Sequence, residues 1–156
     1  PTEFRKALGM FATGVTIVTA RTPTGSLVGL TANSFNSVSL SPPLVLWSLA
    51  NSAGSMAAFS TGSHYAINIL SAEQQTLAQQ FASKDVDRFA NVPYVLGPSG
   101  APLLDGSVAC FECYNRSRYE EGDHIIFVGE VERCTYTPGA APLLYHGGRF
   151  YAEHPL

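Results

Sequence analysis

The chain has 156 residues, enough for one domain with a hydrophobic core, and we expect a single domain over residues 1–156. Charged residues make up only 13% of it and the formal net charge is −3, which argues against a nucleic-acid-binding protein. No apolar stretch reaches about 18 residues, so no membrane span is expected. The low charge predicts that a second copy or a large ligand covers part of the surface.

The first segment predicts an amphipathic helix over residues 3–12. Thr2 is suited to cap its start and Gly14 to end it. Its apolar side chains recur every three or four residues, as expected when one face of a helix is buried. These positions are Phe4, Ala7, Leu8 and Phe11.

A β-hairpin is expected next. The β-branched stretch GVTIVTA (14–20) and the stretch SLVGLTA (26–32) are typical of strands, and the turn residues RTPTG (21–25) join them. Further along, Pro42 and Pro43 exclude a central strand at their own positions. The apolar run LVLWSL (44–49) then predicts a new, buried strand.

The middle of the chain alternates helix and strand signals. A short helix is expected within SAGSMAAF (52–59), followed by a buried strand over HYAINIL (64–70). An S-x-x-Q capping box at residues 71–74 begins a helix that ends near Ala82. Residues 84–102 are rich in Asp, Asn, Pro and Gly and are expected to form a loop.

The last third reads as paired strands. Two long strand patterns, at about 107–119 and 124–137, are joined by the turn sequence EEGD. PLLYHGGRFYAE (142–153) predicts a strand, a Gly-Gly break and another strand. Strands joined by turns, with helices at the start and inserted in the middle, favour a small antiparallel barrel with helices packed outside.

The three cysteines are an odd number in a chain too large to need disulfides, which favours a reducing, cytoplasmic setting. Cys110 and Cys113 form a C-x-x-C spacing inside a strand-like segment, where residues three apart point to opposite faces. No second C-x-x-C or paired His motif accompanies them. We therefore expect neither a metal site nor a disulfide here.

Seven segments together resemble the flavin reductase family, along nearly the whole chain from Phe4 to Tyr151. They are FATGVTIVT (11–19), GLTANSFNSVSLSPPLVLWSL (29–49), YAINIL (65–70), QQFAS (79–83), DRF (87–89), GDHIIFVGEV (122–131) and GGRFY (147–151). The resemblance implies a mainly β fold, an antiparallel Greek-key split β-barrel that binds FMN, with flanking helices. It also implies hydride transfer from NADH or NADPH to FMN or FAD, a homodimer, and a partner monooxygenase that receives the reduced flavin.

The resemblance also assigns residues to the flavin. A flat heteroaromatic ring edged with carbonyls needs donors on a rigid strand, and small residues let the backbone approach it. Hydroxyl and amide groups near a helix start suit a phosphate. The predicted ring contacts are Thr31, Ala32, Asn33, Ser34, Phe81, Ala82 and Ser83. In the next segment Ser48, Asn51, Ser52 and Ser55 are predicted to contact the flavin, the last three at its phosphate. Members often carry a Lys at 50–55, which this chain lacks, so Arg88 and Arg149 are the available cations.

Two more assignments concern the nicotinamide side. His124 follows Gly122 and Asp123 in the motif G-D-H, which the resemblance places beside the nicotinamide nucleotide. Phe150 and Tyr151 are positioned to stack on a nicotinamide or adenine ring. Plainer interpretations stay open at this point. The stretch 31–34 also suits a strand end, Phe81 a core position, and 150–151 ordinary strand packing.

Three rival functions are considered. A flavin-binding electron carrier or sensor could share this fold without a nicotinamide site. A pyridoxine-phosphate oxidase would need a strongly basic pocket, for which this charge-poor chain offers little. A non-enzymatic interaction domain is the most distant alternative.

Overall fold

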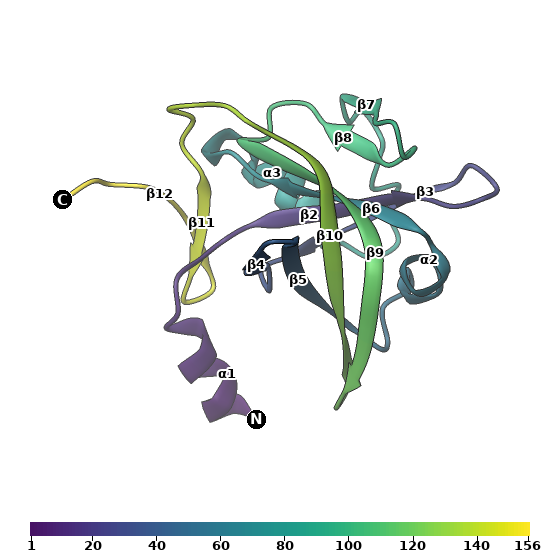
Figure 1. Cartoon of the computed structure of the whole chain (residues 1–156). Helices are drawn as coiled ribbons and strands as arrows, with labels where there is room; N and C mark the ends of the chain where they lie inside the picture. Colours follow the sequence, from purple (N-terminus) through teal and green to yellow (C-terminus); the bar gives the residue numbers. More distant parts are fainter.

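A computed structural model describes residues 1–156 as a mainly β chain (Figure 1). The helices are α1 (Thr2–Gly9), α2 (Met56–Thr61) and α3 (Gln75–Gln80), the last preceded by a 3₁₀ turn over Ala72–Gln74. The strands are β1 (Thr13–Gly14), β2 (Thr16–Arg21), β3 (Leu27–Ala32), β4 (Asn36–Leu40), β5 (Pro43–Ala50), β6 (His64–Ile69), β7 (Tyr94–Leu96), β8 (Pro102–Leu104), β9 (Ala109–Glu121), β10 (His124–Tyr136), β11 (Leu143–His146) and β12 (Arg149–Ala152). No helix is long and apolar enough to cross a bilayer.

One seven-stranded sheet dominates the fold, in the order β3-β2-β6-β9-β10-β5-β4, and every neighbouring pair in it is antiparallel. The sheet is strongly twisted, so β2 and β6 run across β9 and β10 in Figure 1. Its two end strands, β3 and β4, are not hydrogen-bonded to each other, and the barrel is therefore split rather than closed. The predicted mainly β, antiparallel split barrel is confirmed.

The barrel interior is aromatic. Along β5 burial alternates, so Val45, Trp47 and Leu49 point inward. The Trp47 ring stacks on Phe127 with centroids 4.6 Å apart and meets Phe59 edge-on at 5.0 Å. This packing explains the apolar run at 44–49.

A second apolar cluster lies under α3 and the C-terminal hairpin of β11 and β12. It joins Ile17 and Val15 near the start of β2 to Leu70, Ala78 and Phe81. β1 pairs with β11, and β11 with β12, in a separate three-stranded sheet. The second cluster therefore fixes where α3 and the C-terminal hairpin sit relative to β3.

A buried amide ties three strands together. The Asn68 side chain is fully buried; its Nδ2 donates to Ile17 O at 2.9 Å and to Thr19 Oγ1 at 3.1 Å. Its Oδ1 accepts from Leu104 N at 3.0 Å. Asn68 therefore links β6, which carries it, to β2 and β8 through satisfied hydrogen bonds.

Helix α1 differs from its prediction in two ways. It ends at Gly9 rather than at residue 12, and Thr13 shortly after it already pairs with Tyr145 in β1. Pro1, not Thr2, precedes it as the N-cap. None of its residues is buried, and Figure 1 shows it standing apart from the barrel. Its apolar face is exposed to solvent within this chain.

Strands β4, β7 and β8 were not predicted. β7 lies in the segment 84–102, expected to be a loop, and pairs with β8 from Tyr94↔Leu104 to Leu96↔Pro102. β4 arises from the polar stretch NSVSL and pairs with β5. In both cases pairing with a neighbouring strand, rather than local composition, decides the conformation.

The remaining elements form close to their predicted positions, although α2 spans Met56–Thr61 rather than lying within 52–59. Ser71 N donates to Gln74 Oε1 at 2.8 Å in the capping box. The β9–β10 turn consists of Gly122 and Asp123, and the β11–β12 turn of Gly147 and Gly148. All three glycines have positive φ angles, between 58° and 82°, which a residue with a side chain adopts at a cost.

The three thiols are free. Cys110 and Cys113 belong to different core clusters, as expected for residues on opposite faces of a strand. Burial raises the pKa of each of these two thiols to about 12. Such thiols stay protonated and unreactive near neutral pH.

Candidate functional site

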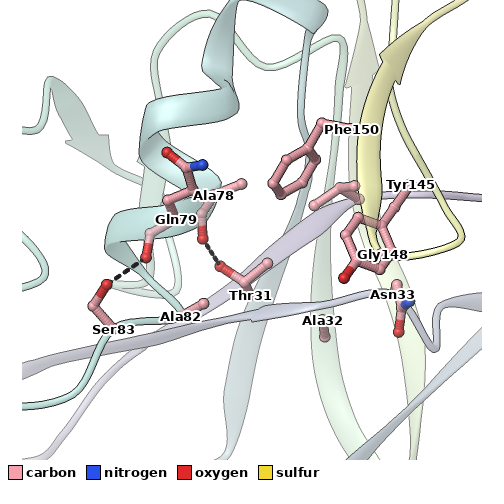
Figure 2. A pocket seen from close by; sticks show the side chains of 11 residues that line it. Thr31, Ala32, Asn33, Ala78, Gln79, Ala82, Ser83, Tyr145, Gly148 and Phe150 are labelled. Carbon is pink, nitrogen blue, oxygen red and sulfur yellow. Dashed lines mark hydrogen bonds between the residues drawn. The ribbon is translucent and has the colours of Figure 1, made fainter. Parts of the chain in front are cut away.

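A cavity of about 440 Å³ lies between β3, α3 and the C-terminal hairpin, and we call it the first cavity. Small residues of β3 and of the end of α3, such as Ala32, Ala78 and Ala82, line one side (Figure 2). Tyr145 and Phe150 of the hairpin line the other side, with ring centroids 5.1 Å apart. The cavity is bounded mainly by apolar groups and by two aromatic rings.

Hydrogen bonds fix the wall between β3 and α3. Thr31 Oγ1 donates to Ala78 O at 2.6 Å, and Thr31 N donates to Phe81 O at 3.3 Å. Ser83 Oγ donates to Gln79 O at 2.7 Å, and Figure 2 shows both hydroxyl contacts. The last turn of α3 therefore partners the edge strand β3, and these two hydroxyls hold the wall together.

Gly29 permits this close approach of α3. A Cβ at this position would lie 2.8 Å from Phe81 Cε2, too close to be accommodated without a shift of the ring. Phe81 is fully buried and meets Phe89 edge-on at 4.9 Å. Phe81 is thus a core residue, and it also lines the neighbouring cavity described next.

A second cavity of about 870 Å³ adjoins the first, with Thr31, Ala82 and Ser83 lining both. It extends to the residues that precede α2, including Ser52 and Ser55. The segment 84–89 forms another wall and brings four charged side chains to it. These are Lys84, Asp85, Asp87 and Arg88.

The two cavities together fit a flavin. The first is large enough for a flat ring and presents Asn33, whose exposed amide has no hydrogen-bond partner within the chain, to the polar edge of such a ring. A Cβ at Gly148 would meet no protein atom within 4 Å, so nothing from the chain fills that space. The second cavity is polar and charged, as a ribityl and phosphate tail requires.

Ten of the sixteen predicted site residues line these cavities. They are Thr31, Ala32, Asn33, Ser52, Ser55, Phe81, Ala82, Ser83, Arg88 and Phe150. Tyr145 also lines the first cavity and was missed, although the sequence held a signal for it. A two-residue turn at Gly147–Gly148 pairs Tyr145 with Phe150. A hairpin that places Phe150 at the cavity therefore places Tyr145 there as well.

The other six predicted residues lie outside both cavity walls. Ser48 N donates to Ser34 Oγ at 2.9 Å, so these two serines hold each other. Asn51 N donates to Asp123 O at 2.9 Å. Arg149 and Tyr151 are exposed on β12. Their proposed roles in binding remain predictions.

His124, the sixth, is exposed at the first position of β10, opposite Ala50 of β5. Its Nδ1 lies 2.7 Å from Asp123 Oδ1, and this hydrogen bond lowers the pKa of the Asp123 carboxyl. The contact orients the imidazole and leaves Nε2 without a partner in the chain. A role beside the nicotinamide remains a prediction.

A split antiparallel barrel, with an aromatic-walled cavity joined to a charged one, defines a flavin-binding oxidoreductase. Comparison with known proteins agrees with this class. The flavin reductase like domain family matches residues 8–154, and the chain belongs to this family. The resemblance identified from the seven sequence segments is thereby confirmed.

Individual relatives are close. The chain is 47% identical over 148 residues to the FMN reductase (NADH) SmoA of Agrobacterium fabrum, covering 95% of this chain and 83% of that one. It is 42% identical over 149 residues to the reductase component of the flavin-dependent trigonelline monooxygenase of Acinetobacter baylyi. That match covers 96% of this chain but only 48% of the relative, so the chain spans about half of that protein.

A solved structure gives the same picture. The fold is similar to that of the NADH:FAD oxidoreductase SgcE6 of Streptomyces globisporus, a structure in complex with NAD and FAD fragments. The TM-score is 0.94 at 44% sequence identity, with 99% of this chain and 93% of that chain covered. The whole barrel, the C-terminal hairpin and α1 are therefore part of the shared fold.

Proposed function

We propose that the chain is an NADH-dependent flavin reductase, an oxidoreductase that oxidises NADH and reduces FMN or FAD. The observation that carries the proposal is the first cavity, bounded by the β3–α3 wall and by Tyr145 and Phe150. Membership of the flavin reductase like family supports the same activity. The names of the relatives, an FMN reductase (NADH) and an NADH:FAD oxidoreductase, support NADH as the donor.

The residues present suit this reaction. A bound flavin supplies the redox chemistry by accepting a hydride from the reduced nicotinamide. The chain has to hold two flat rings in contact, and proximity with correct orientation accounts for most of the catalysis in such a reaction. Ala32 and Ala82 leave room for a ring to lie against the backbone, and Tyr145 and Phe150 limit its access to water. No acid–base pair is required at the cavity.

Charge favours NADH over NADPH. Lys84 and Arg88 are the cations that line the two cavities, and the carboxylates of Asp85 and Asp87 line the same walls. The flavin phosphate needs at least one of these cations. A 2′-phosphate on the same walls would have to share these two cations with the flavin phosphate while facing both carboxylates, and such like-charge contacts are costly.

Anaerobic stopped-flow reduction tests this function. Purified protein is mixed with FMN or FAD and with NADH or NADPH, and the loss of flavin absorbance is followed. We expect rapid bleaching with NADH and a kcat/KM at least about tenfold lower with NADPH. Absence of bleaching with both nucleotides would contradict the proposal and favour an electron carrier or sensor. A preference for NADPH would contradict the charge argument alone.

We also propose that a second copy of the chain covers the apolar face of α1. Phe4 and Leu8 of α1, and Met10 and Phe11 just after its end, are 57–77% exposed, although an apolar group of this size is normally buried. The low content of charged residues supports a covered surface. A hydrogen bond from Gly147 N to Gly9 O, 2.8 Å long, ties this helix to the hairpin that walls the first cavity. Dimer formation would therefore steady the flavin site.

The substitution Leu8→Glu tests the dimer. Placing a carboxylate in an apolar interface should raise the dimer dissociation constant at least about a hundredfold, since the loss of buried apolar area and the desolvation of a charge both oppose association. Sedimentation equilibrium measures the effect, and Lys6→Gln on the exposed side of α1 is the matched control. Wild-type protein that sediments as a monomer would contradict the proposal.

We further propose that the reduced flavin passes to a separate flavin-dependent monooxygenase. The support comes from relatives named as reductase components or subunits of such enzymes, among them the trigonelline monooxygenase of Acinetobacter baylyi and HsaB of Rhodococcus jostii. In the present chain Asn33 and Ala82 are exposed at the cavity wall, which leaves a route for a flavin to leave.

A further inference from the structure

Two cations of the second cavity, Lys84 and Arg88, are placed very differently. A flavin phosphate carries negative charge, and the segment 50–55 offers only neutral side chains to it. The positive charge has to come from the segment 84–89 on the other wall. Which of the two cations is free to supply it follows from their contacts.

Arg88 is already engaged. Its Nε donates to Ser83 O at 3.1 Å and its Nη1 donates to Gly29 O at 2.8 Å. The Gln80 side chain supports the same arrangement, since Nε2 donates to Arg88 O at 2.7 Å and to Ala90 O at 3.1 Å. These bonds fasten the segment 83–90 to β3 and to α3. Two of its five N–H donors are used in this way, so a ligand that pulled the guanidinium out of this position would release two backbone carbonyls and loosen the wall.

Lys84 is unengaged. Its side chain is exposed, and it forms no hydrogen bond and no ion pair within the chain. The carboxylates of Asp85 and Asp87 line the same cavity without pairing with it, and Asp87 Oδ1 instead accepts from Phe89 N at 3.2 Å. An ammonium group on a flexible stem can follow a phosphate without disturbing the fold.

The position of Lys84 also matches the path of a flavin. It directly follows Ala82 and Ser83, the residues that line both cavities. A flavin whose ring occupied the first cavity could extend its ribityl chain past Ala82 and Ser83 into the second cavity. A phosphate at the end of such a chain would then lie near Lys84, which lines the second cavity.

We propose that Lys84 is the phosphate-binding cation for the flavin, and that Arg88 is a positioning residue that holds the segment 83–90 against β3. The proposal rests on the proposed function, because it takes the ring of the flavin to lie in the first cavity. Family members often carry a lysine in the segment 50–55, and this chain does not. Lys84 would supply the positive charge that this lysine would otherwise provide.

Ligands with and without phosphate separate the two roles. The dissociation constants of riboflavin, FMN and FAD are measured by flavin fluorescence for wild type, Lys84→Gln, Arg88→Gln and Arg88→Lys. Lys6→Gln, which removes an exposed lysine on α1, is the control for net charge. Each protein is also melted thermally without ligand, and FMN binding is repeated at several salt concentrations.

Lys84→Gln should weaken FMN binding about tenfold, leave riboflavin binding within about twofold, and leave the melting temperature unchanged. It should also flatten the salt dependence of FMN binding, since an exposed charge pair is screened by salt. Arg88→Gln should weaken all three ligands by a similar factor and lower the melting temperature. Arg88→Lys should not rescue it, because one ammonium does not reproduce the fork that reaches two carbonyls.

Other outcomes overturn the assignment. If Lys84→Gln weakens riboflavin and FMN equally, or neither, Lys84 does not bind the phosphate. A selective loss of FMN in Arg88→Gln that Arg88→Lys restores would make Arg88 the phosphate cation instead. Wild-type protein that binds none of the three flavins would overturn the proposed function itself. This result differs from the two outcomes above, in which the wild-type protein still binds flavin.

Discussion

Replacing Ala82 by Trp is expected to weaken flavin binding severely, raising the dissociation constant for FMN at least about a hundredfold. Ala82 lines both cavities and is itself exposed, and Figure 2 places it beside Thr31 at the wall. An indole at this position occupies the space that the ring and the start of its ribityl chain need. Quenching of flavin fluorescence measures the dissociation constant.

The fold should survive this substitution, because the new side chain projects into a cavity and not into the core. The melting temperature of Ala82→Trp should stay within a few degrees of wild type. Ala57→Trp is the control, since Ala57 is exposed on α2 and lines neither cavity. Tight FMN binding by Ala82→Trp would exclude the two cavities as the flavin site.

Replacing Asn68 by Leu is expected to destabilise the barrel by about 3 kcal/mol, and to lower the melting temperature by roughly 10 °C. Leucine has nearly the shape of asparagine but cannot accept the hydrogen bond of Leu104 N or donate to Ile17 O. It therefore leaves a buried donor without a partner on β8. Urea unfolding followed by tryptophan fluorescence measures the change in the free energy of unfolding.

Asn36→Leu provides the matched control for this change. Asn36 is exposed on β4 and its side chain makes no hydrogen bond, so the same substitution should cost less than about 0.5 kcal/mol there. Equal stability of Asn68→Leu and wild type would mean that the buried amide does not hold β2, β6 and β8 together.

Much of the fold could be predicted because its signals are local. The turns at Gly122–Asp123 and Gly147–Gly148 need backbone conformations that favour glycine, and they define two hairpins. β5 is defined by an apolar run that starts at a proline pair. The strands β4 and β7 could not be found in this way, because their sequences are polar or loop-like and only pairing with distant residues makes them strands.

The site was harder to predict than the fold. The stretch 29–49 is rich in hydroxyl and amide side chains, and the resemblance to the flavin reductase family assigns several of them to the flavin. In the structure Thr31 donates to Ala78, 47 residues away, and Ser34 bonds to the backbone of Ser48. A hydroxyl donates equally well to a ligand and to a distant carbonyl. The sequence alone cannot distinguish these partners, whereas Asn33 is left with a free amide in the first cavity.

Helix α1 has no packing partner in its own chain, and the sequence could not predict what covers it. The apolar spacing of Phe4 and Leu8 correctly indicated a helix, although it ends before Phe11, and the spacing said nothing about what covers it. Burial depends on the assembly, and helix periodicity reports only that one face is apolar. The proposed second copy supplies the missing cover.

A crystal structure of the protein with FMN tests the central claim most directly. We predict that the isoalloxazine ring lies in the first cavity against the β3–α3 wall, with its other face turned toward Tyr145 and Phe150 and open to the nicotinamide. Its ribityl chain should pass Ala82 toward the second cavity. Electron density for the ring at another place on the chain, with Tyr145 or Phe150 folded into the first cavity, would contradict the account.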